Sequence, residues 1–161
     1  MILKALCDYL DRESIRYTVI SHSPAFTAQE IAATSHISGR ELAKTVILRI
    51  DGELAMAVLP ASYRVDVELL GELSGAIRIE MAHEADFRDV FPGCETGAMP
   101  PFGNLFGMPV QVADELTNDE YIAFNAGSHT ELIQMRYRDF ERLVQPRVLD
   151  FAAVVAGHHR R

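Results

Sequence analysis

Two apolar, β-rich segments joined by Asp51-Gly52 constrain the fold more than any other part of this sequence. The first segment, KTVILRI, covers residues 44–50, and the second, ELAMAVL, covers residues 53–59. Asp-Gly is a preferred pair for a two-residue hairpin turn, because both residues tolerate a positive φ. The sequence therefore predicts two antiparallel strands that pair across residues 51–52.

Helical and β patterns alternate on both sides of this hairpin. The first dozen residues carry apolar side chains at helical spacing, and Thr27-Ala28-Gln29-Glu30 is a capping box that starts a helix running towards Gly39. Further helices are predicted over 66–73, 83–90 and 137–144, and further strands over 15–20, 76–80, 109–113, 122–125 and 131–135. Hairpins intermixed with helical crossovers predict an α/β (α+β) fold, with a mixed, barrel-like β-sheet surrounded by helices. We expect a single domain over residues 1–161, with a flexible tail from about residue 150.

The charge balance limits the partners that this chain can have. Fifteen basic and twenty-three acidic residues give a net charge of −8, whereas phosphate neutralisation by basic groups supplies the affinity of non-specific nucleic-acid binders. We therefore expect no DNA partner, and any RNA contact should be small and local. No run of about 18 apolar residues is present, so no membrane span is expected. The N-terminus does not resemble a signal peptide, which favours a cytoplasmic protein.

Common catalytic and ligand-binding motifs are missing from the sequence. Cys7 and Cys94 are too few and too far apart for a zinc site or a disulfide framework, and we expect no metal and no cofactor. There is no G-x-S-x-G elbow, Walker loop, H-E-x-x-H or G-x-G-x-x-G segment. Familiar nucleophile enzymes, P-loop enzymes and zincins are therefore not supported.

The most unusual segment is Gly97-Ala98-Met99-Pro100-Pro101-Phe102-Gly103. Its prolines fix φ and remove amide donors, while its glycines admit conformations closed to other residues. Such a loop is stiff and can present main-chain groups to a small ligand. The alternative interpretation is a tight crossover that packs Phe102 into the core.

Two further positions are candidates for chemistry. Lys44 is a cation at the start of a strand, where it could meet a phosphate or a developing oxyanion, although a solvated strand end explains it equally. His129 lies in Asn125-Ala126-Gly127-Ser128-His129, which joins two predicted strands. A hairpin turn needs residues of this kind, but a histidine there could also bind or orient a substrate group.

In their order and spacing, these pieces resemble the YbaK/prolyl-tRNA editing-domain family. The matching segments are His22-x-Pro24, Thr27-Ala28-x-Glu30, the lysine in Leu42-Ala43-Lys44-Thr45-Val46, the G-x-x-x-P-F-G loop at 97–103, and Ala126-Gly127-Ser128-His129. The resemblance extends from the N-terminal helix to about Val144.

The resemblance implies hydrolysis of the ester that links a wrongly attached amino acid to the 3′-terminal adenosine of a tRNA. Members of the family are inserted in prolyl-tRNA synthetase or act in trans as separate proteins, and this chain resembles the separate kind. The implied partner is the 3′ CCA end of a mischarged tRNA, of a tRNA(Pro) type carrying a small amino acid, together with prolyl-tRNA synthetase.

The resemblance also implies roles for particular residues. Lys44 and His129 would be catalytic, with Lys44 holding the terminal phosphate or orienting the ester. The substrate would be bound by Thr45, by the loop residues and by the late glycine, namely Gly97, Pro101, Phe102, Gly103 and Gly127. Some alanine-specific relatives carry Asn where this chain has Thr45, which leaves the substrate amino acid open.

Two alternative hypotheses compete with a deacylase. One is a non-catalytic nucleotide- or protein-binding module of the same fold, motivated by the net charge and by the lack of an obvious general base. The other is a DNA- or oligonucleotide-binding regulator, which would need a basic face. The residues that hint at one also fit solvated helix charges, namely Arg136, Arg138, Arg142, Arg147 and the tail.

Overall fold

The computed structural model describes residues 2–23, 30, 37 and 41–154. Its central feature is the predicted hairpin, formed by β2 (Leu42–Ile50) and β3 (Glu53–Pro60). Ile50 pairs with Glu53, which leaves Asp51 and Gly52 as a two-residue turn with φ values of +50° and +88°. Two successive positive φ values are what a type I′ turn requires, so the hairpin prediction is confirmed.

The hairpin lies in a mixed eight-stranded sheet. The strand order is β1-β8-β7-β2-β3-β6-β9, and β5 also pairs with β2. The contacts of β2 with β7, β3 with β6, and β6 with β9 are parallel, and the remaining pairs are antiparallel. The other strands of this sheet are β1 (Tyr17–Ser21), β5 (Ile79–Met81), β6 (Val110–Ala113), β7 (Tyr121–Asn125), β8 (Glu131–Arg136) and β9 (Arg147–Leu149).

The predicted mixed fold is confirmed, although the sheet remains open. Within the described residues the strand order ends at β1 on one side and at β9 on the other, so backbone pairing does not close it into a barrel. A separate two-stranded sheet consists of β4 (Tyr63–Val65) and β10 (Ala152–Val154).

Both faces of the hairpin are buried, which explains its continuous apolar sequence. On β3, Met56 and Val58 join the larger hydrophobic core, while Ala57 and Leu59 join a smaller core. Successive side chains of a strand leave opposite faces of the sheet. A strand that is covered on both sides therefore loses the apolar–polar alternation of a half-exposed strand.

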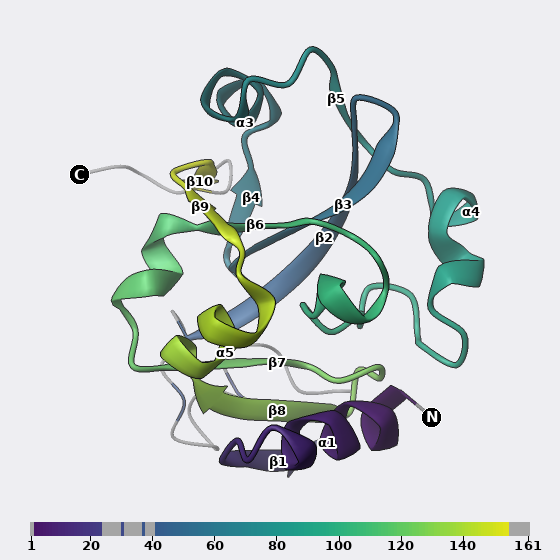
Figure 1. Cartoon of the computed structure of the whole chain (residues 1–161), viewed down its shortest axis with the longest axis vertical. Helices are drawn as coiled ribbons and strands as arrows, with labels where there is room; N and C mark the ends of the chain where they lie inside the picture. The colour runs from purple at the N-terminus through teal and green to yellow at the C-terminus, as the bar shows by residue number, and fades with distance from the viewer. Residues whose placement is uncertain (1, 24–29, 31–36, 38–40, 155–161) are drawn as a thin grey trace.

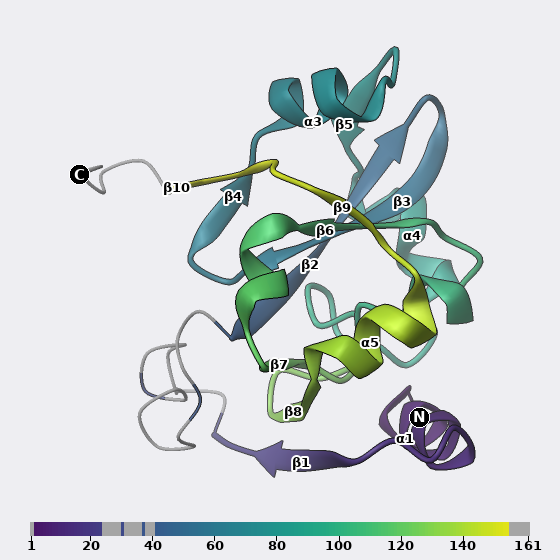
Figure 2. The same cartoon turned by 60° about the vertical axis from the view of Figure 1, so that its left-hand side comes forward.

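Helices cover these cores at opposite ends of the molecule (Figures 1 and 2). The helix α1 contributes Leu6 and Leu10 to the larger core, and α3 contributes Leu70 to the smaller one. Within the described part of the chain, no helix is long and apolar enough to cross a membrane. The helical elements are α1 (Ile2–Arg12), α3 (Val67–Ser74), α4 (Glu84–Phe87), α5 (Tyr137–Val144) and the 3-10 turns η1 (Arg88–Val90), η2 (Gly103–Leu105) and η3 (Asp114–Asn118).

Residues 151–154 differ from the predicted flexible tail. We expected a flexible tail from about residue 150, but Phe151 is fully buried in the smaller core and β10 pairs with β4. The amide of Asp66 also donates to the carbonyl of Phe151 at 2.9 Å. The capping residues 27–29, Pro24, His36 and the tail histidines lie outside the described residues.

Candidate functional site

The loop around Gly97 and the loop around Gly127, both candidates from the sequence, are joined by backbone hydrogen bonds. The amide of Glu95 donates to the carbonyl of Gly127 at 2.8 Å, and the amide of Gly127 donates to the carbonyl of Ala98 at 2.9 Å. Gly127 belongs to the turn between β7 and β8 and has a φ of +99°, a value that favours glycine. The structure thus brings the segments around Gly97 and Gly127 together, although they are distant in sequence.

The N-terminal part of the Gly/Pro loop is a β-turn over Glu95–Ala98. The amide of Ala98 donates to the carbonyl of Glu95 at 3.0 Å, and Gly97 has a φ of +84°. A φ near +80° marks the second central residue of a type II turn, which is usually glycine. The carbonyl of Thr96 accepts no bond within this turn and is available to the neighbouring loop.

The imidazole ring of His129 is hydrogen-bonded to that carbonyl. Its ring Nε2 lies 2.7 Å from the carbonyl oxygen of Thr96, and its backbone amide donates to Oε1 of Glu95 at 2.7 Å. A Cβ atom at Gly97 would lie 3.5 Å from Cε1 of His129, so the imidazole packs directly against the turn. The predicted candidates Gly97, Gly127 and His129 therefore form one hydrogen-bonded junction.

Lys44 lies on the strand next to this junction. In the parallel contact between β2 and β7, Ala43 pairs with Phe124. Lys44 and Asn125 are the residues that follow this pair, and Asn125 begins the turn that carries His129. Lys44 is half-buried and, within the described residues, has no carboxylate partner. Burial lowers its pKa from the ordinary value, since a partly dehydrated ammonium is less stable in its charged form.

Thr45 contributes little surface to this region. Its side chain is buried, at 7% exposure, and lies on the opposite face of β2 from Lys44, because successive strand residues alternate. The two neighbours therefore do not present their side chains to the same space.

The C-terminal half of the Gly/Pro loop is part of the core. Phe102 is fully buried, and its ring lies 5.5 Å from that of Phe140 and 5.6 Å from that of Phe124. A Cβ atom at Gly103 would lie 2.4 Å from the carbonyl oxygen of Met108 and 2.5 Å from Cγ2 of Val110. Close packing thus accounts for the glycine. Of the substrate-binding candidates, the buried side chain of Phe102 cannot reach a ligand, and buried Pro101 and Gly103 could offer only main-chain groups.

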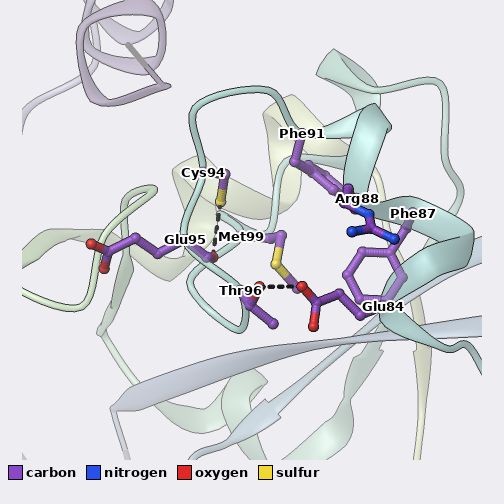
Figure 3. Close-up of a pocket in the computed structure, with 8 residues that line it drawn as sticks. All are labelled: Glu84, Phe87, Arg88, Phe91, Cys94, Glu95, Thr96 and Met99. Atoms are coloured by element: carbon purple, nitrogen blue, oxygen red, sulfur yellow. Dashed lines mark hydrogen bonds between the residues drawn. The ribbon is translucent and has the colours of Figure 1, made fainter.

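A pocket of about 240 Å³ lies between α4 and the turn of the loop (Figure 3). Within it, the hydroxyl of Thr96 donates to Oε1 of Glu84 at 2.9 Å. Figure 3 shows the side chain of Glu95 directed away from Glu84 and Arg88, in keeping with its bond to the amide of His129. The pocket is lined by Glu84, Phe87, Arg88, Phe91, Cys94, Glu95, Thr96 and Met99.

The polar residues of this pocket carried no signal in the sequence. Glu84 and Arg88 look like ordinary exposed residues of a short helix, and Glu95 and Thr96 precede the motif. Cys94 is not an activated thiol, because burial, followed by the charge of Glu95, raises its pKa to about 11. Within the described residues, no three His, Cys, Asp or Glu side chains are placed to hold a metal ion.

The match to a family model shows the class of protein to which the chain belongs. A family model described as the aminoacyl-tRNA editing domain matches residues 22–143, and the chain belongs to this family. The predicted family and the predicted class of enzyme, an aminoacyl-tRNA editing hydrolase, are confirmed.

Individual relatives cover nearly the whole chain. The multifunctional Ser/Thr-tRNA deacylase ProXp-y of Escherichia coli K12 is 29% identical over 151 residues, which cover 88% of this chain and 87% of the relative. The prolyl-tRNA editing protein ProX of Acetoanaerobium sticklandii is 23% identical over 157 residues, covering 94% and 95%. A crystal structure provisionally described as a trans-editing enzyme for prolyl tRNA synthetase superposes with a TM-score of 0.78. It is 16% identical to this chain, with 92% of this chain and 95% of that chain covered.

Proposed function

We propose that this chain acts in trans on the 3′ CCA end of a mischarged tRNA and removes a small amino acid at the junction of the Gly97 turn, His129 and Lys44. The observation that carries this proposal is the bonding of His129 to the Gly97 turn at 2.7 Å. This bond joins the loop that the family resemblance assigns to substrate binding and the histidine that it assigns to catalysis. The family match supports the tRNA substrate, and the relatives' names support deacylation and editing of charged tRNA.

The chemistry requires little beyond positioning. An aminoacyl ester is an activated bond, so hydrolysis needs an oriented water and donors aimed at the developing oxyanion. The exposed backbone of the Gly97 turn supplies fixed main-chain groups, and His129 supplies a ring held by hydrogen bonds. Lys44 supplies a cation whose partial burial strengthens its attraction to a phosphate or an oxyanion.

The proposed substrates follow from the relatives. One relative is named for Ser/Thr-tRNA and the other for prolyl-tRNA editing, so we place the substrate of this chain among small amino acids, on a tRNA(Pro) type of tRNA. A methylene group in a pocket changes binding by only about 1–3 kcal/mol, and we therefore expect the chain to accept more than one small amino acid. We further propose that prolyl-tRNA synthetase is a partner and that the protein acts in the cytoplasm.

The experiment that tests the proposal is release of amino acid from a panel of charged tRNAs. The panel contains Ala-, Cys-, Ser- and Thr-tRNA(Pro), with Pro-tRNA(Pro) as the correctly charged control and spontaneous hydrolysis in buffer as the baseline. We expect turnover of at least one small mischarged amino acid and no turnover of Pro-tRNA(Pro). Binding of the whole panel without any turnover would instead support the non-catalytic binding module.

A further inference from the structure

Glu95 makes two contacts with the turn that carries His129. Its backbone amide donates to the carbonyl of Gly127 at 2.8 Å, and its carboxylate accepts the amide of His129 at 2.7 Å. A hydrogen bond to a carboxylate is roughly twice as strong as one between neutral groups. The two contacts hold the backbone on either side of Ser128, and therefore fix the position from which the imidazole of His129 projects.

The hydrogen bond of the imidazole determines its protonation pattern. The carbonyl of Thr96 can only accept a hydrogen bond, so the ring Nε2 at 2.7 Å must carry the proton. A neutral imidazole has one protonated nitrogen, and Nδ1 of His129 then carries the lone pair. Within the described residues no hydrogen bond to Nδ1 is formed.

We propose that Glu95 is a positioning residue for His129, and that Glu95 and the carbonyl of Thr96 together present Nδ1 of His129 to the reacting ester or its water. This inference rests on the proposed function, in which His129 acts on the aminoacyl ester. It assigns a role to a residue outside the G-x-x-x-P-F-G motif.

The same turn offers a second anchor that separates specific positioning from general loosening of the loop. The hydroxyl of Thr96 donates to Glu84 at 2.9 Å, a contact separate from the two bonds to His129. Thr96→Ala removes this anchor but leaves the carbonyl of residue 96 and the carboxylate of Glu95 in place. If Glu95 acts only by stiffening the loop, Thr96→Ala and Glu95→Ala should impair the enzyme equally.

The test begins with the unmodified protein. In a long-range ¹H–¹⁵N correlation spectrum of ¹⁵N-histidine-labelled protein, recorded at a pH where the ring is neutral, we expect His129 to show a protonated Nε2 and an unprotonated Nδ1. A protonated Nδ1, or an equal mixture of both tautomers, would overturn the proposal without any variant having to fold.

Kinetics then test the role of the carboxylate. We expect Glu95→Ala to lower kcat for the best charged tRNA by roughly tenfold to a hundredfold, with KM changed by less than about threefold, because misplacement of a reacting group affects the chemical step. Glu95→Gln retains an oxygen acceptor and should recover most of the activity. Glu72→Ala, which removes an exposed carboxylate on α3, serves as the control for charge and should match the unmodified enzyme.

The outcomes distinguish the positioning role from the proposed function itself. If His129→Ala is inactive but Glu95→Ala has an unchanged kcat, the positioning role of Glu95 is overturned, while the proposed function of His129 is retained. Full activity of His129→Ala would overturn both. Equal losses in Glu95→Ala and Thr96→Ala, without rescue by Glu95→Gln, would show a purely structural role and also overturn the proposal.

Discussion

At the level of single residues, Lys44 has an environment unlike that of the chain's other lysine. The sequence contains only Lys4 and Lys44. Lys4 is exposed and donates to Asp8 at 2.8 Å, and this bond raises its pKa. Lys44 is half-buried, and desolvation lowers its pKa. The pKa values of the two lysines are therefore shifted in opposite directions.

This difference predicts the order in which the two lysines lose their protons. After reductive methylation with ¹³C, we expect the Lys44 resonance to titrate at a lower pH than the Lys4 resonance, with Lys4→Ala used to assign the signals. Folding destabilises the charged form of Lys44, and this lowers the free energy of unfolding by its full amount at any pH below the folded-state pKa. The loss becomes smaller as the pH rises from the folded-state pKa towards the ordinary value of 10.5. Titration of Lys44 at or above the pH of Lys4 would contradict the burial of its ammonium.

Two glycines with different surroundings give a second prediction at this scale. A Cβ atom at Gly103 would meet the backbone of Met108 at 2.4 Å, whereas at Gly71, within α3, the nearest atom would lie 4.0 Å away. We expect Gly103→Ala to lower the free energy of unfolding by about 1–3 kcal/mol through overpacking. Gly71→Ala should raise it by roughly 0.5–1 kcal/mol through helix propensity. Urea denaturation of both variants measures these changes in the free energy of unfolding. An unchanged free energy of unfolding for Gly103→Ala would show that the loop is not packed as described.

At the level of elements, the sequence predicted structure that is determined locally and missed structure that depends on distant partners. The β2–β3 hairpin was predictable because its turn residues and its β-formers lie together in sequence. The strands β4, β9 and β10 have three residues each, too few for a periodic pattern to show, and they form only because distant segments pair.

In the candidate site, too, the locally determined parts were predictable and the contacts between distant segments were not. The Gly97 loop and the turn around His129 could each be recognised from composition and from resemblance, but their meeting depends on the fold. Glu95 and Thr96 gave no signal, because a polar side chain before a loop is ordinary in any sequence. Phe102 and Gly103 belong to the motif through core packing, which composition alone does not separate from ligand binding.

A side chain at the tip of the hairpin binds the segment immediately before β5, and this gives a prediction about an element. Oδ1 of Asp51 accepts the amides of Ile77 at 2.9 Å and Arg78 at 2.7 Å, while the residue itself has a φ of +50°. Asp51→Gly keeps the turn conformation but removes the acceptor, and should lower the free energy of unfolding by about 1 kcal/mol. Asp51→Asn keeps an acceptor and tolerates the positive φ. Chemical denaturation should therefore show a smaller decrease in the free energy of unfolding for Asp51→Asn than for Asp51→Gly. The reverse order would contradict this account.

At the level of the whole molecule, the acidic charge has to be reconciled with an RNA substrate. The net charge of −8 opposes extended contact with a tRNA backbone, and a site confined to the CCA end limits the number of phosphates that are contacted. Affinity for tRNA should then depend only weakly on salt, since each neutralised phosphate contributes about −0.7 to −0.9 to the slope of log K against log salt.

The salt dependence is therefore a direct prediction. We expect a slope no steeper than about −4 for a mischarged tRNA, and the same slope for a short acceptor-stem RNA that ends in CCA. Fluorescence anisotropy over a range of salt concentrations measures both. A slope steeper than about −6, or a much shallower slope for the short RNA, would indicate broad backbone contact.

The central claim is that the chain hydrolyses a mischarged aminoacyl-tRNA at the site beside Lys44. The most direct measurement is the single-turnover rate of deacylation for the unmodified chain, for Lys44→Ala and for Lys4→Ala as the matched control, using the best substrate of the panel. We expect Lys44→Ala to lower the rate by about a hundredfold, as for loss of one oxyanion-stabilising group, with thermal unfolding nearly unchanged, and Lys4→Ala to retain the full rate. Full activity in Lys44→Ala, or an equal loss in both variants, would contradict the account.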